Sequence, residues 1–238
     1  MAVLYLIRHG QAAFGNPDYD QLSSIGKRQA RILGRHMARY LPRLDALCSG
    51  GMKRQDETAE LAREAMGASP PPLHTREAFR EYDHEALFRA YLPSFTTEEG
   101  GPPPEIGALL KDSRQLERAL RHVLRSWIEG AAHEGPAVRS WQEFCAGALA
   151  GVENLLKTHG PRSRVAVFTS GGVVTAVLRS LLGLSGRKAL GINLSIYNGS
   201  ITQVYVPGPG RTADALLLGY NNITHLELAG DKDLITFR

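Results

Sequence analysis

The chain has 238 residues, of which 43% are hydrophobic and 22% charged, with a formal net charge of +4 and a pI of about 9.2. This composition predicts a globular domain with a sizeable core. No apolar run approaches the roughly 20 residues that a membrane span needs, and the N-terminal run stops too early for a secretory signal. We therefore expect a cytoplasmic protein without a membrane partner.

Three near-continuously apolar segments predict strands that are covered on both faces, as in a parallel sheet: residues 2–7, 44–49 and 165–169. Each is followed by a turn and a helical pattern, over residues 23–41, 52–66 and 173–183. Ser23 or Ser24 can cap the first helix, and Gly183 can end the third. Alternating strands and helices indicate an α/β fold.

Two Pro/Gly clusters, at 67–79 and 96–107, interrupt regular structure. Between and after them lies a mainly helical middle, which we interpret as an insertion or cap over about residues 85–158 of a single domain, 1–238. Within it, residues 111–125 form the densest cationic run. Its apolar spacing predicts an amphipathic surface helix, and without aromatic platforms or a recognisable module we expect no nucleic-acid partner.

The middle segment is also where we expect the substrate pocket. Its aromatic side chains could form the walls of such a pocket, although packing in the core is the favoured role: Phe88, Tyr91, Phe95, Trp127 and Trp141.

Two later runs, 195–206 and 213–221, predict edge strands joined by a Pro/Gly loop. The expected architecture is thus a three-layer sandwich, a mostly parallel sheet flanked by helices, with a mainly helical insertion. Cys48 and Cys145 have no metal-binding or redox spacing, and we expect two buried, reduced thiols.

The first strand ends in an unusual tripeptide, Arg8-His9-Gly10. A planar, always charged guanidinium suits bidentate phosphate binding, and a glycine allows the backbone to approach a ligand closely. Arg54 follows the second strand, near the start of the second helix. Because ligands bind where parallel strands end and helices begin, we expect these side chains to face one anionic ligand.

A cluster of ionisable groups follows Phe79, with Glu81, Asp83, His84 and Glu85 close together. A carboxyl group in an apolar or anion-rich pocket has a raised pKa, which fits it to protonate a leaving oxygen. The residues alone indicate such an acid only as a member of this cluster.

Five motifs, taken in their order along the chain, resemble those of the histidine phosphatase superfamily, also called the phosphoglycerate-mutase-like family. Arg-His-Gly after an N-terminal strand is the first. The others are LSSIGKRQA at 22–30, CSGGMKRQDETA at 48–59 with Ser49, Arg54, Thr58 and Ala59 in place, FREYDHE at 79–85 and NNITHL at 221–226. The resemblance covers essentially the whole chain.

The resemblance implies a phosphatase that forms a phosphohistidine at His9 and acts on a small phosphorylated substrate, without a metal or other cofactor. Arg8 and Arg54 would hold the phosphoryl oxygens, and Glu81, chosen over Asp83, would protonate the leaving oxygen. The same resemblance makes Gly10, Gln11 and Gly171 candidate substrate-binding residues.

One departure from the family pattern affects the chemistry. The family usually ends its later buried strand with Ser/Thr-His-Gly-Gly, and here Ser170 stands at the histidine's position. A hydroxyl can donate one hydrogen bond but carries no charge near neutral pH. We therefore expect activity reduced by Ser170, unless His84 or His225 replaces the imidazole in space.

Two alternatives remain open at this point. Ser170 also fits a phosphate-binding pseudoenzyme with a regulatory or scaffold role. A phosphoglycerate-type mutase is less favoured, because residues 11–26 lack the Ser, Trp and Asn pattern of the family's mutases.

Overall fold

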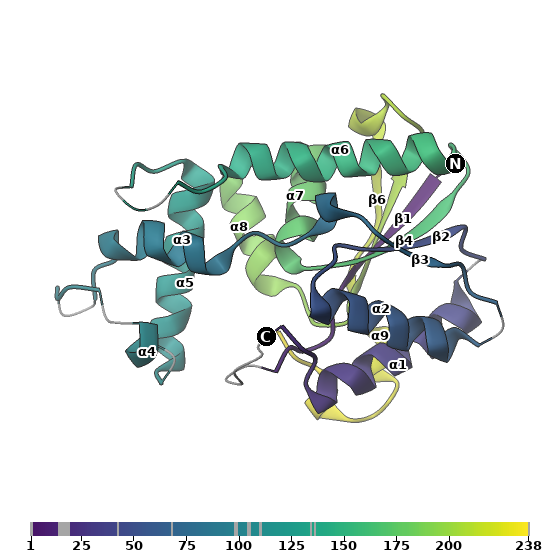
Figure 1. Cartoon of the computed structure of the whole chain (residues 1–238), viewed down its shortest axis with the longest axis horizontal. Coiled ribbons are helices and arrows are strands. Elements are labelled where there is room, and N and C mark those ends of the chain that lie inside the picture. Colours follow the sequence, from purple (N-terminus) through teal and green to yellow (C-terminus); the bar gives the residue numbers. More distant parts are fainter. Residues whose placement is uncertain are drawn as a thin grey trace.

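A six-stranded sheet in the order β3-β2-β4-β1-β5-β6 lies at the centre of the computed structural model (Figure 1). The structure describes residues 2–13, 20–41, 43–67, 69–97, 100–103, 106–109, 111–133, 135 and 137–237. The strands are β1 (Ala2–Arg8), β2 (Ala46–Ser49), β3 (Leu73–Thr75), β4 (Arg164–Thr169), β5 (Ile201–Val206) and β6 (Leu216–Asn222). β1 to β4 pair in parallel, whereas β5 and β6 add antiparallel strands.

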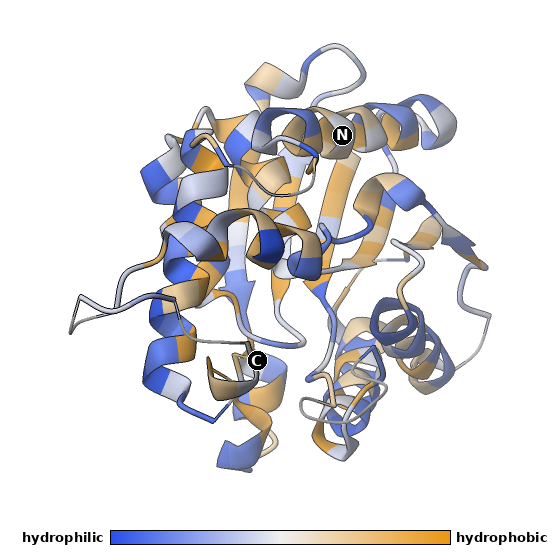
Figure 2. Ribbon diagram, turned by 60° about the vertical axis from the view of Figure 1, so that its left-hand side comes forward, coloured by the Kyte–Doolittle hydropathy of each residue, from blue (hydrophilic) through white to orange (hydrophobic). Residues whose placement is uncertain are grey.

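Helices cover both faces of the sheet, and side-chain alternation along β1 separates the two cores. Tyr5 and Ile7 pack with α1 (Ser24–Tyr40) and α2 (Lys53–Met66) on one face. Leu4 and Leu6 pack on the other face, with α6 (Trp141–His159) and α7 (Gly171–Leu182). Apolar strands between helices with polar outer surfaces are visible in Figure 2. The predicted mostly parallel three-layer α/β sandwich is therefore confirmed.

The helical insertion projects to one side of the sheet (Figure 1, left). Its helices are α3 (His84–Tyr91), α4 (Ile106–Leu109) and α5 (Ser113–Glu129), with the 3-10 turn η2 (Leu92–Ser94) after α3. α6 runs back along the sheet beside α7. Trp127 of α5 and Trp141 of α6 are buried edge to face, with ring centroids 5.0 Å apart, which fits the favoured core role.

The C-terminal part completes the fold with α8 (Gly186–Ser195), α9 (Thr224–Glu227) and the 3-10 turns η3 (Thr212–Asp214) and η4 (Lys232–Leu234). α9 and η4 pack on α1. Ser23 accepts a hydrogen bond from the backbone N–H of Gly26 and so caps α1, and Gly183 ends α7 in the left-handed conformation, as expected.

The structure corrects three expectations. Leu73–Thr75 forms β3 inside the segment expected to lack regular structure, because a short strand beside β2 needs no periodic pattern of its own. β5 is an interior strand between β1 and β6, so only β6 is an edge. The run expected from residue 195 becomes a strand only at 201, since residues 186–195 form α8.

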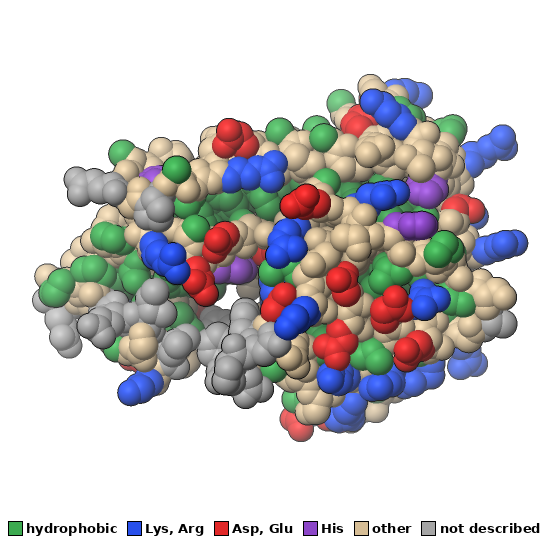
Figure 3. Space-filling model, in the orientation of Figure 1, with side chains coloured by type: hydrophobic (Ala, Val, Ile, Leu, Met, Phe, Trp, Pro, Cys, Tyr) green, Lys and Arg blue, Asp and Glu red, His purple; other side chains and the backbone are tan. Residues whose placement is uncertain are grey.

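Lys and Arg side chains are interspersed with Asp and Glu on the face seen in Figure 3. Among the described residues, no helix is long and apolar enough to cross a membrane. Cys48 and Cys145 are buried and unpaired, as expected.

Candidate active site

The site forms where β1 and β4 end side by side. Arg8 and Thr169 are paired across the two strands, and the backbone N–H of His9 donates to the carbonyl of Thr169 over 2.8 Å. Gly199, in the turn before β5, donates its N–H to the carbonyls of Arg8 and His9 at 3.0 and 3.2 Å. The sheet's own hydrogen bonds thus fix the backbone of the Arg-His dipeptide from both sides.

The imidazole of His9 is oriented by two contacts. Its Nδ1 lies 2.7 Å from the carbonyl oxygen of Gly10, and its Nε2 lies 3.1 Å from Nε of Arg54. Because a carbonyl only accepts, Nδ1 carries the proton and donates it. Nε2 therefore holds the lone pair, which accepts a hydrogen bond from Arg54.

The charge state of His9 follows from its surroundings. The side chain is buried, and burial, followed by the charges of Arg54 and Arg8, lowers the pKa of His9 well below its usual value of 6.5. A neutral imidazole, with a lone pair on one ring nitrogen, is the nucleophilic form of histidine.

Two guanidinium groups supply positive charge. Arg54 is buried, and one of its terminal nitrogens lies 2.6 Å from the carboxylate of Asp20. Asp20 also accepts from the backbone N–H of Lys53 at the start of α2, so it holds both the helix end and the guanidinium. Arg8 donates to the carbonyl of Ile196. Sequence reasoning missed Asp20, which lies in no motif.

Glu81 is held against the start of α7. Its carboxylate accepts from the backbone N–H groups of Gly172, over 2.9 Å, and Tyr82, over 3.1 Å. Burial raises the pKa of Glu81, against the opposing effects of the Gly172 N–H and of Arg54. The carboxyl group thus lies close enough to Arg54 for the two to interact electrostatically. Its buried environment nevertheless favours the protonated form.

The structure separates the carboxyl groups that the sequence left together. Asp83 is exposed and caps α3, where its side chain accepts from the backbone N–H of Ala86 over 3.0 Å. Its neighbour His84 packs against Tyr82 with the rings tilted, their centroids 4.4 Å apart. Burial and the charge of Arg54 lower the pKa of His84 to about 4, which keeps this ring neutral at pH 7.

The second histidine considered as a replacement lies elsewhere. His225 of α9 packs against His36 of α1 with the rings tilted, their centroids 5.2 Å apart. His84 affects the pKa of His9, whereas His225 is not among the groups that do. Of the two, only His84 is placed near His9.

Gly10 is required by close packing. A Cβ atom on Gly10 would lie 2.6 Å from the carbonyl oxygen of Gly26 in α1, so no other residue fits without moving the helix. The side-chain oxygen of Gln11 accepts from Ser23, the cap of α1, over 2.8 Å. Gly171 lies beside Arg8, since its Cβ would be 3.9 Å from Arg8 Nε.

Ser170 lies at the tip of β4 and is buried. Its Oγ accepts a hydrogen bond of 2.8 Å from Nε2 of Gln55, the residue after Arg54. Sequence reasoning missed Gln55, because a glutamine on a helix gives no signal of burial or of a distant partner.

A cavity of about 300 Å³ adjoins Glu81 on the side of the insertion. Tyr82, Trp127 and Phe144 line it, with Arg80 and Arg139 among its polar residues. Among the aromatic residues considered as pocket walls, only Trp127 lines this cavity. Within the described residues, no cluster of three or more His, Cys, Asp or Glu side chains is arranged to hold a metal ion.

In a comparison with protein families, the chain matches the model of the histidine phosphatase superfamily, branch 1, over residues 4–89 and 108–217. No curated protein sequence matches the chain.

Several solved structures share the fold. The phosphoserine phosphatase of Entamoeba histolytica, in complex with 3-phosphoglyceric acid, is 18% identical, with a TM-score of 0.63 over 95% of this chain and 100% of the other. A phosphoglycerate mutase from Bacillus anthracis is 18% identical, with a TM-score of 0.64 over 97% of each chain. A mycobacterial glucosyl-3-phosphoglycerate phosphatase is 21% identical, with a TM-score of 0.62 over 93% of this chain and 99% of the other. At these identities the likeness concerns the fold.

Proposed function

Because this chain belongs to branch 1 of the histidine phosphatase superfamily, we propose that it hydrolyses a small phosphomonoester through a phosphohistidine at His9, without a metal ion. The observation that carries the proposal is the orientation of His9. Gly10 fixes the proton on Nδ1, and Nε2 presents its lone pair beside Arg54. Attack on phosphorus needs this neutral tautomer, and the Arg54 N–H that now occupies the Nε2 lone pair would turn to the phosphoryl group when the substrate binds.

In the first step, Nε2 of His9 attacks phosphorus and the ester P–O bond breaks. Arg8 and Arg54 bind the phosphoryl oxygens and offset the charge that develops on them. Protonated Glu81 gives its proton to the leaving alcohol oxygen. The products of this step are the free alcohol, the phosphohistidine and an ionised Glu81.

In the second step, the Glu81 carboxylate accepts a proton from water as the water oxygen attacks phosphorus. The P–N bond breaks, inorganic phosphate leaves, and both His9 and Glu81 return to their starting protonation states. The raised pKa of Glu81 supports its use as an acid first and a base second.

A phosphate-binding pseudoenzyme is the second candidate, and Ser170 favours it. A buried hydroxyl bonded to a neutral amide supplies no charge to the phosphoryl group. Replacing a charge-assisted hydrogen bond with a neutral one can cost on the order of 10²-fold in rate. In that case wild-type protein would bind phosphate without turning over a broad panel of phosphomonoesters, and Ser170→His would create activity.

A phosphoglycerate-type mutase ranks third. The segment that argues against it, residues 11–26, lies partly outside the described residues, at 14–19. Isomerisation of a phosphoglycerate without net phosphate release would favour this activity.

The deciding experiment measures phosphate release from an activated aryl phosphate in EDTA. We expect turnover by the wild type, loss of turnover in His9→Ala, and an acid-labile phosphoryl adduct on His9 by rapid-quench mass spectrometry. His74→Ala is the matched control, because His74 is exposed on β3 and takes no part in the site. Full activity in a pure His9→Ala preparation would overturn the proposal.

A further inference from the structure

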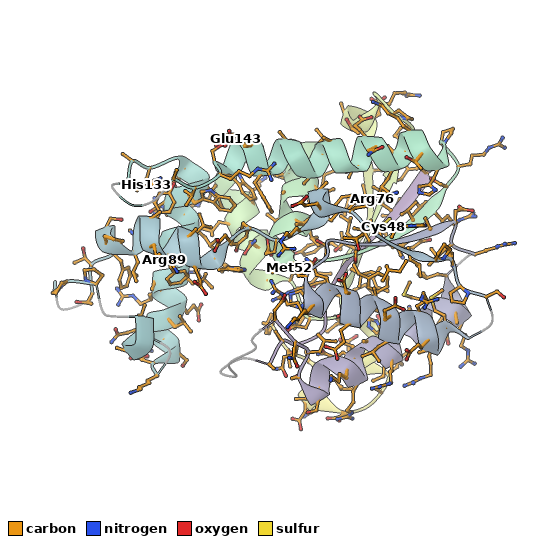
Figure 4. All side chains as sticks on the ribbon, in the orientation of Figure 1. Cys48, Met52, Arg76, Arg89, His133 and Glu143 are labelled. Carbon is orange, nitrogen blue, oxygen red and sulfur yellow. The ribbon has the colours of Figure 1, made fainter. Side chains whose placement is uncertain are left out.

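Gln55 is a buried glutamine whose amide group makes three polar contacts. Its Nε2 lies 2.8 Å from Oγ of Ser170 and 3.4 Å from the carbonyl oxygen of Phe79. Its Oε1 lies 3.3 Å from the backbone nitrogen of Met52. Met52 directly precedes α2, at the end of that helix nearest the centre of the molecule (Figure 4).

These partners settle which way the amide points. The Phe79 carbonyl can only accept, and the Met52 N–H can only donate, so the nitrogen of the Gln55 amide must face Phe79 and Ser170. Gln55 is therefore the donor in its hydrogen bond with Ser170. The hydroxyl of Ser170 is the acceptor.

An accepting hydroxyl still has its own proton to donate. Ser170 precedes α7 as its N-cap, yet its side chain makes no capping hydrogen bond. Within the part of the chain that the structure describes, Gln55 is the one hydrogen-bond partner found for this hydroxyl, although the residue is only 1% exposed. A buried donor without an acceptor is costly, which points to an acceptor supplied by a ligand.

The position of Ser170 identifies that ligand as the phosphoryl group. Ser170 follows Thr169, whose carbonyl binds the backbone of His9, and precedes Gly171, which lies beside the Arg8 guanidinium. The two residues that flank Ser170 in the chain thus contact His9 and lie beside Arg8, which puts Ser170 next to the place where an anionic oxygen would bind.

We propose that Gln55 is a positioning residue that holds the Ser170 hydroxyl as a hydrogen-bond donor to the bound phosphoryl group. The inference rests on the proposed function, in that the site binds phosphate. Donation by Gln55 polarises the Ser170 hydroxyl and strengthens the bond that it donates in turn. Two neutral side chains thereby form a short chain of hydrogen bonds that ends on the ligand.

The test is a double-mutant cycle on the affinity for inorganic phosphate, measured by calorimetry. Ser170→Ala removes the donor, and we expect a loss of about tenfold or more, as for a hydrogen bond to a charged group. Gln55→Met keeps the length of the side chain but cannot donate, and we expect a loss of about three- to tenfold. In the Ser170→Ala background the same Gln55→Met change should have almost no effect, because Gln55 acts through Ser170.

Ser163→Ala is the matched control, since Ser163 is a buried serine at the opposite end of β4. It should leave phosphate affinity unchanged, and thermal melts should show that every variant is folded. Equal losses from Gln55→Met in both backgrounds, or none in either, would overturn the inference.

The cycle needs binding and not turnover, so its outcome is separate from that of the His9→Ala assay. If the protein binds phosphate without hydrolysing esters, the phosphatase proposal fails while a coupled Gln55 and Ser170 still support the inference. A wild-type protein that binds no phosphate would overturn both.

Discussion

The carboxylate of Glu81 accepts a hydrogen bond from the backbone N–H of Gly172 over 2.9 Å, and the space beside that N–H admits no side chain. A Cβ on Gly172 would lie 2.2 Å from Oε1 of Glu81 and 2.4 Å from Cε1 of Tyr82. Gly172, the second residue of α7, therefore holds Glu81 in place because it lets the carboxylate approach the backbone closely.

We predict that Gly172→Ala displaces Glu81 and lowers kcat by about 10²-fold, at the low end of what general acid catalysis contributes. The overpacking should also destabilise the fold by about 1–3 kcal/mol. Steady-state kinetics on an alkyl phosphate, with urea unfolding of the same variant, measure both effects.

Gly191→Ala in α8 is the control for this change. A Cβ on Gly191 meets nothing within 4 Å, and the residue is exposed. We expect unchanged kinetics and equal or slightly greater stability, because alanine is the better helix former. Wild-type kcat in Gly172→Ala would mean that Glu81 does not depend on this contact.

Glu81 and Asp83 should respond differently when each carboxyl group is replaced by an amide. Glu81→Gln removes the proposed proton donor, and its effect should grow with the basicity of the leaving group. We expect about 10²-fold or more on an alkyl phosphate and much less on an activated aryl phosphate. Asp83→Asn should stay near wild type, because asparagine caps a helix as well as aspartate does. The reverse pattern would identify Asp83 as the acid.

The pH dependence of kcat/KM follows from two opposite pKa changes. The pKa of His9 lies well below 6.5, so the imidazole of this proposed nucleophile stays neutral as the pH falls. The pKa of Glu81 is raised, so this proposed proton donor keeps its proton further toward neutral pH and loses it above that pKa. We expect alkyl phosphate hydrolysis to persist as the pH falls below 6.5, where a histidine of ordinary pKa would become protonated.

The Glu81→Gln variant checks this assignment. A glutamine does not titrate, so the decline in kcat/KM on the basic side should disappear in the variant while the acid side is unchanged. A decline below pH 6.5 in wild type would contradict the lowered pKa of His9.

The part of the fold that sequence reasoning found is the part with local patterns. Continuous apolar runs predicted β1, β2 and β4, and the cap at Ser23 was visible from residue type. β3 and the interior place of β5 were missed, because both depend on which strand lies alongside. A three-residue strand has too few positions for any periodicity to show.

The same distinction applies to the site. His9 and the two arginines could be brought together by one topological rule, that parallel strand ends share an edge. The contacts that orient them join residues far apart in sequence: Gly172 to Glu81 across 91 positions and Gln55 to Ser170 across 115. No local pattern encodes such pairs. The contact between Asp20 and Arg54 could not be predicted from the sequence for the same reason.

The last prediction concerns acid stability and His225, which lies outside the site. Burial, and then the neighbouring His36, lower the pKa of His225 from 6.5 to about 4. A histidine with a depressed pKa in the folded state stabilises the fold above pH 6.5, and this contribution is lost as pH falls toward 4, because only the unfolded chain takes up the proton. This difference in pKa corresponds to roughly 3 kcal/mol of unfolding free energy at most.

His225→Phe, which keeps an aromatic ring against His36, should therefore flatten the fall in unfolding free energy between pH 6.5 and about 4. Urea unfolding across this range, with His74→Phe on exposed β3 as control, measures it. Parallel curves for wild type and His225→Phe would mean that other groups set the acid sensitivity.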